Sequence, residues 1–126
     1  MINRGDGIFE VLADPVRRRL IELLSEGPHT AGDLTAAVVG EIGVSQPAVS
    51  NALRTLREAE VADCAADGRR RIYTLRPDAL AEAEQWLHRR RSLWAGALES
   101  LQTEVARGRR DDRRSRAGDG PGRATA

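Results

Sequence analysis

The chain has one cysteine, no lysine and only four aromatic residues of the Trp, Tyr and Phe types among its 126 residues. A single cysteine cannot form a disulfide within the chain. Cys64, His29 and His88 also lack the paired spacing of a metal site, which needs several thiolate or imidazole ligands. We therefore expect no metal and no cofactor, and Cys64 to be a small apolar strand residue. An inducer metal and a redox switch at Cys64 are weaker alternatives.

Long apolar segments are missing as well. No run of about eighteen apolar residues occurs, as a membrane-spanning helix would need. Residues 1–6 lack the apolar core of a signal peptide, so we expect no membrane partner and a cytoplasmic protein. The sequence has no Gly-rich phosphate loop, no serine nucleophile elbow and no histidine at a diagnostic spacing from an acid. With room for one domain but hardly for a deep catalytic pocket, it predicts a small binding protein and not an enzyme.

The net charge of +1 averages two unlike parts of the chain. Residues 1–106 carry 13 arginines against 16 acids, whereas residues 107–126 carry 7 arginines against 3 acids. We predict that residues 1–106 fold and that residues 107–126 form a disordered, Arg-rich tail, because apolar residues nearly vanish from Arg107 on. Nucleic-acid binding by the mildly acidic folded part then requires its positive charge to be local.

The most informative stretch runs from Val44 to Leu56. Ser45 is a helix-capping residue and Pro47 suits the first helical turn. Apolar residues follow at spacings of three and four, which predicts a helix to about Glu60 with one apolar face. The other face is polar and carries Gln46, Ser50, Asn51 and Arg54.

A basic hairpin follows this helix. Residues 61–64 and 70–75 are predicted strands, joined by a turn over residues 65–69 that contains Asp67 and Gly68. A polar helix followed by a basic hairpin predicts a winged helix-turn-helix domain. The fold class is therefore mainly α with a small β-hairpin, in the order α-α-α-α-β-β-α.

The remaining periodic segments fit this order. Residues 8–13 predict a short helix, residues 14–26 a second one with Pro15 in its first turn, and residues 30–42 a third one capped by Thr30. After residue 78 a long helix places Leu80, Ala83, Leu87, Trp94, Ala97 and Leu101 at heptad positions. Arg90 and Glu104 interrupt this register, which suits a helix that packs partly on its own domain and partly on a partner.

With its elements in this order, the chain resembles the ArsR/SmtB-type family of bacterial winged-helix repressors, in the branch without metal-sensing thiolates. Residues 12–24, 45–50, 53–59 and 68–75 carry the resemblance. It implies a homodimeric transcriptional repressor whose first and fifth helices form the dimer interface. The residues of this interface would be Ile8, Phe9, Leu12, Leu87, Trp94, Ala97, Leu98 and Leu101.

The chain departs from the family pattern at three places. The segment from Leu34 to Ser45 is longer by about four residues, close to one helical turn. Asn51 and Ala52 stand where a basic residue and a histidine are frequent, which weakens the expected phosphate contact. Glu60 replaces the small residue expected before the wing, so that turn has to close in another way.

The predicted DNA contacts follow from the chemistry of the side chains. Gln46 and Asn51 can read an adenine edge in the major groove, and Arg54 is expected at a phosphate, since base contacts come from the first turns of a recognition helix. The candidate residues are Ser45, Gln46, Pro47, Ser50, Asn51, Arg54, Arg69, Arg70, Arg71 and Tyr73. Arg69 and Arg71 are expected on one face of the hairpin and Arg70 on the other. Packing within the wing is the preferred role of Tyr73.

The sequence thus predicts a dimeric, sequence-specific transcriptional regulator that binds double-stranded DNA, most simply a repressor at an inverted-repeat operator. Its half-sites would lie one helical turn, roughly 34 Å, apart. Two alternatives stay open: a winged-helix module that binds a protein and has lost DNA binding, and a regulator gated by a small organic ligand near Trp86 or Trp94.

Overall fold

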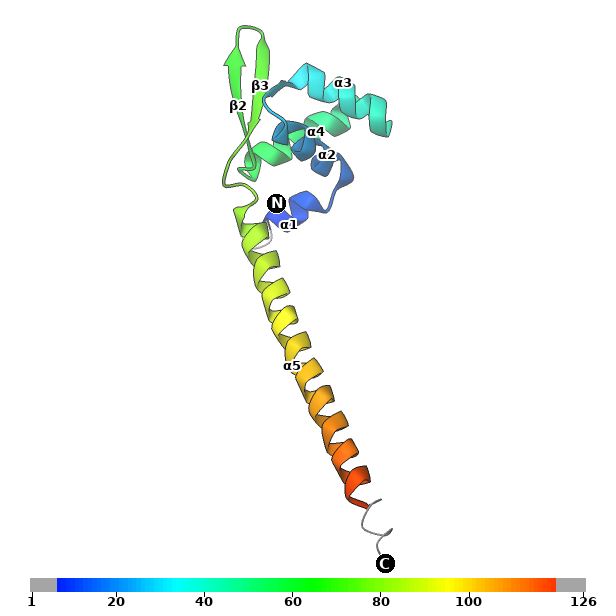
Figure 1. Cartoon of the computed structure of the whole chain (residues 1–126). Helices are drawn as coiled ribbons and strands as arrows, with labels where there is room; N and C mark the ends of the chain where they lie inside the picture. The colour runs from blue at the N-terminus through cyan, green and yellow to red at the C-terminus, as the bar shows by residue number, and fades with distance from the viewer. Residues whose placement is uncertain (1–6, 120–126) are drawn as a thin grey trace, which may run out of the picture. The chain divides into compact units, whose positions relative to one another are not determined.

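The computed structural model describes residues 7–119, with side chains up to residue 115. The chain consists of two compact units, Met1–Gln85 and Trp86–Ala126. The first unit holds four helices and a small sheet, and the fifth helix begins in it and continues through the second unit (Figure 1). In chain order the elements are α1 (Gly7–Leu12), α2 (Pro15–Ser25), β1 (His29–Thr30), α3 (Ala31–Ile42), α4 (Gln46–Glu58), β2 (Ala62–Asp67), β3 (Arg70–Leu75) and α5 (Ala81–Asp119).

Three helices begin at the predicted capping residues. The side chain of Asp14 accepts a hydrogen bond from the backbone N–H of the third helical residue at 3.0 Å. Thr30 and Ser45 do the same at the starts of α3 and α4, at 3.1 and 3.3 Å. Each cap satisfies a backbone donor that the helix itself leaves unpaired. The predicted starts of α2, α3 and α4 are therefore confirmed.

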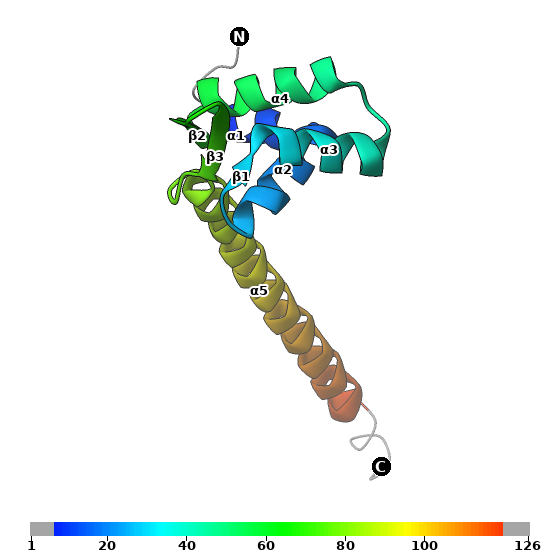
Figure 2. The ribbon, with the colours of Figure 1, turned by 90° about the horizontal axis from the view of Figure 1, so that it is seen from above.

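The core of the first unit lies where these helices meet. α2 packs against α1, α3 and α4, and β2 and β3 pack against α4 and α2. Leu20, Leu34 and Leu56 supply one large side chain from each of the three central helices, and all three are fully buried. Each is worth about 1.5–3 kcal/mol of transfer free energy. These side chains fix α3 and α4 on α2, with a short turn joining the two helices (Figure 2).

The buried apolar face of α3 ends before the helix itself ends. Leu34 and Val38 are buried, whereas Ile42, predicted on the same face, is 41% exposed. α3 is continuous through Gly40 and stops at Gly43, which adopts φ = 80°. The additional residues therefore form one more helical turn, as predicted, but this turn extends past the core.

The sheet is antiparallel with the order β1-β3-β2. β2 is longer than predicted and reaches Asp67, which pairs with Arg70, so the hairpin turn consists of Gly68 and Arg69 alone. Gly68 has φ = 63°, a conformation that two-residue hairpin turns require and glycine adopts without strain. The predicted turn over residues 65–69 is therefore wrong in length. β1, which pairs with β3, has only two residues and is too short to show a sequence period.

The end of α4 explains how the chain turns into the wing without a glycine. The N–H of Val61 donates to the carbonyl of Leu56 at 2.9 Å, and the N–H of Glu60 donates to the carbonyl of Arg57 at 3.0 Å. This pair of bonds is a Schellman motif, whose left-handed position is normally glycine. Glu60 occupies that position with φ = 60°, at some expense in backbone strain.

Two arginines of α2 close the C-terminal end of α1. Arg17 donates to the carbonyls of Val11 at 3.1 Å and Glu10 at 2.8 Å, and Arg18 donates to the carbonyl of Leu12 at 2.6 Å. Positive charge at the end of a helix is favourable, because the last carbonyls have no partner within the helix. Arg17 and Arg18 thus hold α1 on α2.

In the second unit, α5 continues to Asp119. The structure differs here from the prediction of a disordered tail from Arg107 on. Arginine and alanine are good helix formers, no proline occurs between Pro77 and Pro121, and a helix already formed is extended at little entropic expense. Residues 120–126 lie outside the described part of the chain. Within residues 7–119, no helix combines the length and the apolar character needed to cross a membrane.

Candidate nucleic-acid interface

α4 has two sharply different faces. Val49, Leu53 and Leu56 are at most 3% exposed and face the core, together with Ala52. The opposite face is open to solvent, as a reading helix requires. Every candidate residue of this helix and its cap is exposed, namely Ser45, Gln46, Pro47, Ser50, Asn51 and Arg54.

The first turn of α4 offers both a side-chain amide and a helix N-terminus. The Ser45 hydroxyl accepts from Ala48 N–H at 3.3 Å, so it caps the helix and keeps its own hydrogen for a further acceptor. Gln46 begins the helix and has a free amide, which can donate and accept at once, as an adenine edge requires. Pro47 has no N–H, and the N–H groups of Ala48 and Val49 are bonded to Ser45, so a phosphate at this end would meet the N–H of Gln46 and the positive end of the helix dipole.

The wing presents its arginines at the tip of the hairpin. Arg69 lies in the turn, Arg70 and Arg71 open β3, and all three are exposed. Arg70 lies 3.4 Å from the carboxylate of Asp67 across the turn, an exposed pair that fixes its position only weakly. In Figure 1 the β2–β3 hairpin projects beside α4. Residues 61–76 hold four arginines and two acids, so the positive charge that the first unit lacks overall is concentrated here.

Tyr73 does not belong to this exposed set. Its side chain is 5% exposed and lies in the core. Burial raises the pKa of its hydroxyl, the neighbouring Cys64 thiol adds to the rise, and Arg57 acts in the opposite direction. The prediction that Tyr73 contacts DNA is therefore wrong, and its preferred role of packing within the wing agrees with the structure. Cys64, its partner across the strands, is half-buried.

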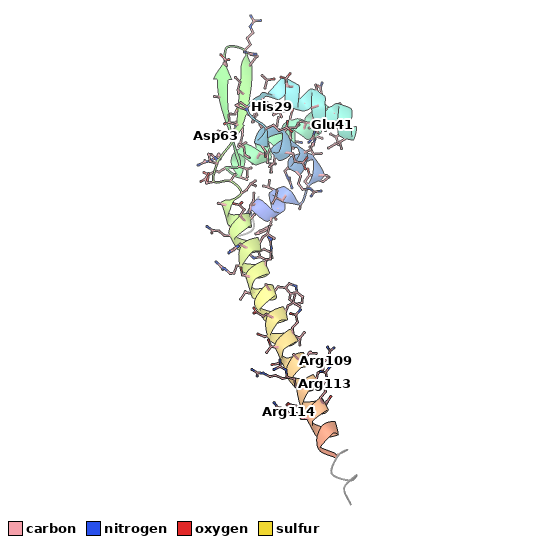
Figure 3. The ribbon with its side chains drawn as sticks, in the orientation of Figure 1. His29, Glu41, Asp63, Arg109, Arg113 and Arg114 are labelled. Carbon is pink, nitrogen blue, oxygen red and sulfur yellow. The ribbon has the colours of Figure 1, made fainter. Side chains whose placement is uncertain are left out.

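The extra turn of α3 is tied back to α2 by a forked ion pair. Arg19 donates from Nε to Glu41 at 2.6 Å and from a terminal nitrogen to the second oxygen of the same carboxylate at 3.1 Å. It also donates to Glu22 at 3.0 Å. These bonds raise the pKa of Arg19, and the guanidinium holds the pKa of Glu41 below its ordinary value. Glu41 lies near the end of α3 that leads into α4 (Figure 3). The ion pair therefore supports the end of α3 just before the turn that leads to the exposed polar face of α4.

The predicted interface residues of α1 and α5 fall into two groups. Ile8 is 6% exposed and belongs to the core of the first unit, and Phe9 and Leu12 pack partly buried against it. Ile8 is thus unavailable to a partner in this conformation, because α1 uses its apolar face to cover α2. The residues predicted on α5, by contrast, are exposed: Leu87, Trp94, Ala97, Leu98 and Leu101.

Metal ligands are not gathered anywhere in the described part of the chain. Within residues 7–119, no three side chains of the His, Cys, Asp or Glu types lie together as a metal ion would need. His29 uses its Nδ1 in a 2.8 Å hydrogen bond with the carbonyl oxygen of Gly27 and pairs with Tyr73 through the sheet.

Comparison with known proteins places this geometry in a family. Residues 14–63 match the model of the bacterial regulatory proteins of the arsR family. The HTH-type transcriptional regulator Rv2034 of Mycobacterium tuberculosis is 37% identical over 93 residues, which are 74% of this chain and 80% of the relative. The chain belongs to the ArsR family. The transcriptional repressor SdpR of Bacillus subtilis is 30% identical over 82 residues, covering 65% of this chain and 87% of the relative.

Solved structures agree with this assignment. An ArsR family transcriptional regulator has a TM-score of 0.63 at 27% identity, covering 74% of this chain and 98% of that one. A possible transcriptional regulator for arsenical resistance has a TM-score of 0.57 at 38% identity, covering 69% and 83%. The fold is therefore the predicted winged helix-turn-helix, and the ArsR relatives are transcriptional regulators, not enzymes.

Proposed function

We propose that this ArsR-family chain is a homodimeric repressor that reads an inverted-repeat operator with α4 and contacts the flanking DNA backbone with the β2–β3 wing. The observation that carries the proposal is the exposed polar face of α4, whose other face is fully committed to the core. A helix with this arrangement can enter the major groove without unfolding the domain. The regulator and repressor names of the relatives agree with it.

Within this proposal, the α4 side chains have distinct roles. Gln46 and Asn51 read base edges, and Ser50 contacts a base or a phosphate, because short polar side chains in the first turns reach the groove floor. Arg54, further along the helix, neutralises a phosphate. The wing arginines contact phosphate or the minor groove and add affinity that is independent of sequence.

Dimerisation is proposed through α5. Leu87, Trp94 and Leu101 are 58%, 65% and 56% exposed, which is unusual for large apolar side chains on one helix and marks an interaction surface. Two copies related by a two-fold axis would place two α4 helices on successive major grooves, which is why the operator should be an inverted repeat.

The test uses the full chain and the DNA upstream of its own gene. Fluorescence anisotropy should give tighter binding to a fragment of this DNA than to a random duplex, by at least about 10³-fold at physiological salt. Affinity for both should fall steeply as salt rises, since several arginines release counterions from the phosphates. Equal affinity for the two duplexes would contradict sequence-specific reading. Salt-independent or absent binding would favour the protein-interaction module instead.

A second measurement addresses the dimer. Leu101→Asp places a charge on the exposed apolar face of α5, and light scattering should then report one chain where the wild type has two. Gln102→Asp, which adds the same charge at the neighbouring exposed position away from that face, should leave the mass unchanged. An unaltered mass for Leu101→Asp would move the interface away from α5.

A further inference from the structure

The later turns of α5 carry a dense group of exposed arginines. Residues 107–114 hold five arginines against two aspartates, whereas residues 81–106 of the same helix hold three arginines against four glutamates. All five side chains are exposed: Arg107, Arg109, Arg110, Arg113 and Arg114. Three of them are labelled where they project from the helix in Figure 3. Positive charge is therefore concentrated on this segment and not spread along α5.

These arginines share one side of the helix. At about 100° per residue, all five fall within an arc of roughly 160°. Asp111 and Asp112 lie in the remaining arc, on the same side of the helix as the exposed apolar Leu101 and Val105. We call the five arginines the basic face of α5. Because it is directed away from the apolar side chains, it stays open to solvent even when a partner covers them.

The helix itself does not account for the basic face. Cations stabilise the end of a helix only within its last turn, and Arg114 lies five residues before the last helical residue, Asp119. Ion pairing does not account for it either. Among the residues whose side chains the structure describes, none of the five arginines is bound to a carboxylate. Five guanidinium groups are thus available to an external anion.

The composition of the segment limits the class of partner. No aromatic residue follows Trp94, so the basic face has no rings on which unpaired bases can stack, as the binding of single strands requires. From Ala106 to the end of α5 no large apolar side chain occurs. A helix that inserts into a lipid surface or anchors in a protein interface needs such side chains. A ridge of phosphates is the partner that suits guanidinium groups alone.

The spacing of the arginines suits the backbone of a duplex. Arg107, Arg110 and Arg114 form one row along the helix, and Arg109 and Arg113 form a second row. Together they span about 10 Å at 1.5 Å per residue. Duplex DNA carries one negative charge per about 1.7 Å of its axis, so this length presents about six phosphates from the two strands. The numbers of charges on the two surfaces are therefore comparable.

We propose that the basic face of α5 is a second DNA-binding site, which contacts the phosphates of a duplex without reading its sequence. It adds affinity for every duplex, while α4 supplies the preference for one of them. The choice of double-stranded DNA as the partner rests on the proposed function of the chain. The site itself depends only on the second unit of the structure.

Salt-dependent binding of the full chain tests this site. A five-glutamine variant replaces all arginines of the basic face and keeps a residue type that forms helices well. In fluorescence anisotropy its affinity for a random duplex should be lower by about tenfold or more at physiological salt, and the slope of log affinity against log salt should be smaller by about 3 to 4. The ratio of affinities for the upstream fragment and the random duplex should stay as in the wild type, because base contacts are unchanged.

Two double variants separate the site from the total charge. Arg109→Gln with Arg113→Gln, and Arg89→Gln with Arg91→Gln, remove the same charge from exposed positions of the same helix. The first pair should reduce the salt slope by about 1.8, at about 0.9 per phosphate contact. The second pair should leave the slope close to that of the wild type. Equal reductions would show that only net charge matters and would overturn the site. Circular dichroism checks that each variant keeps its helix.

Photo-cross-linking tests where the duplex lies. In a Cys64→Ser background, which removes the only native thiol, Ala106→Cys borders the basic face, and Ala95→Cys lies on the same side of α5 about three turns earlier. Each is labelled with benzophenone maleimide and irradiated with the random duplex. Ala106→Cys should be joined to DNA several times more efficiently than Ala95→Cys. Equal or reversed efficiencies would contradict contact at the basic face.

The remaining outcomes are distinguishable. Tighter binding of an RNA duplex of the same sequence, or loss of binding to phosphatidylserine vesicles in the five-glutamine variant with DNA binding unchanged, would overturn DNA as the partner. If the wild type prefers its upstream fragment and the five-glutamine variant keeps its full affinity and salt slope, this inference fails and the proposed function stands. If the variant loses affinity for random duplex but the wild type shows no preference for the upstream fragment, the proposed function fails and the second site stands.

Discussion

α4 and α5 are both amphipathic helices, but they use their apolar faces in opposite ways. On α4, Leu53 and Leu56 are 3% and 0% exposed. On α5, Leu87 and Trp94 are 58% and 65% exposed. The two helices are built from the same kinds of residue at similar spacings, so the difference lies in what covers them. The apolar face of α4 is covered by its own chain, which leaves the polar face to act on something else.

The comparison shows which face of each helix is free to function. In the proposed complex the function of α4 falls to its polar side, whose amide and guanidinium groups would meet hydrated DNA. In the proposed dimer the function of α5 falls to its apolar side, whose removal from water would be favourable. A helix is therefore assigned a role by its unburied face, whatever the chemistry of that face.

The largest expected difference between the helices is in stability. Leu56→Ala should lower the free energy of unfolding by about 2–5 kcal/mol, because it leaves a cavity in the core of the first unit. In denaturant titrations at concentrations where the chain is monomeric, this loss should not depend on protein concentration. Leu101→Ala should change the stability of the single chain by less than about 0.5 kcal/mol and act only at concentrations where chains associate. Equal, concentration-independent losses would erase the distinction between the two faces.

The next difference is in DNA binding. Gln46→Ala should cost about 1–3 kcal/mol of specific binding and relax the preference at one base pair, as it removes a base-reading amide. Arg71→Ala should instead weaken binding to all duplexes alike. Gln102→Ala on α5 provides the matched control, and in anisotropy titrations it should change neither the affinity for the specific duplex nor the affinity for random duplexes. If Gln46→Ala lowered specific and random binding equally, α4 would not be the reading helix.

A smaller effect is expected where α4 ends. Glu60→Gly should stabilise the first unit by roughly 0.5–1 kcal/mol, because glycine adopts the left-handed conformation without the strain of a Cβ atom. This is the net gain after subtracting the conformational entropy that glycine adds to the unfolded chain. Thermal unfolding measures this gain. Glu60→Ala keeps the strain, so a similar gain from alanine would show that the lost carboxylate is responsible and not the backbone.

The smallest effect concerns the ion pair at the end of α3. Arg19 lowers the pKa of Glu41 in the folded state, so the pair contributes stability above the ordinary carboxyl pKa and loses it as pH falls through the folded value. Glu41→Gln should therefore be slightly less stable than the wild type at pH 7, with the gap closing in acid. Glu58→Gln, at an exposed glutamate without an ion pair among the described residues, should show no such closing in pH-dependent melts.

The sequence predicted the first unit well where local chemistry decides structure. Asp14, Thr30 and Ser45 cap helices because their side chains accept hydrogen bonds from nearby backbone groups, and this depends on only four consecutive residues. The apolar spacing of α4 likewise predicted its buried face. The candidate DNA residues on α4 were identified because they lie on the polar face opposite the buried one. Their exposure agrees with the prediction, and their contacts with DNA stay a prediction.

What escaped prediction depends on contacts between distant segments. The bond between Arg19 and Glu41 joins residues 22 positions apart, and β1 exists only because β3 lies beside it. Tyr73 was counted among the possible DNA contacts as part of the basic hairpin, but it lies further from the hairpin tip than Arg71, between His29 and Cys64 in the sheet, where it is buried. Past Arg107, composition suggested disorder, although a helix can continue through charged residues once earlier turns have formed.

The wing has a consequence for how binding would be distributed between enthalpy and entropy. A hairpin closed by Gly68 and Arg69 alone has few backbone conformations to surrender when a duplex lies against it. A longer, looser tip would have to be ordered on contact, and part of the attraction of its charges would be lost to that ordering. A short tip therefore makes the wing a pre-organised support, so that in the proposed complex its arginines set the depth at which α4 enters the groove.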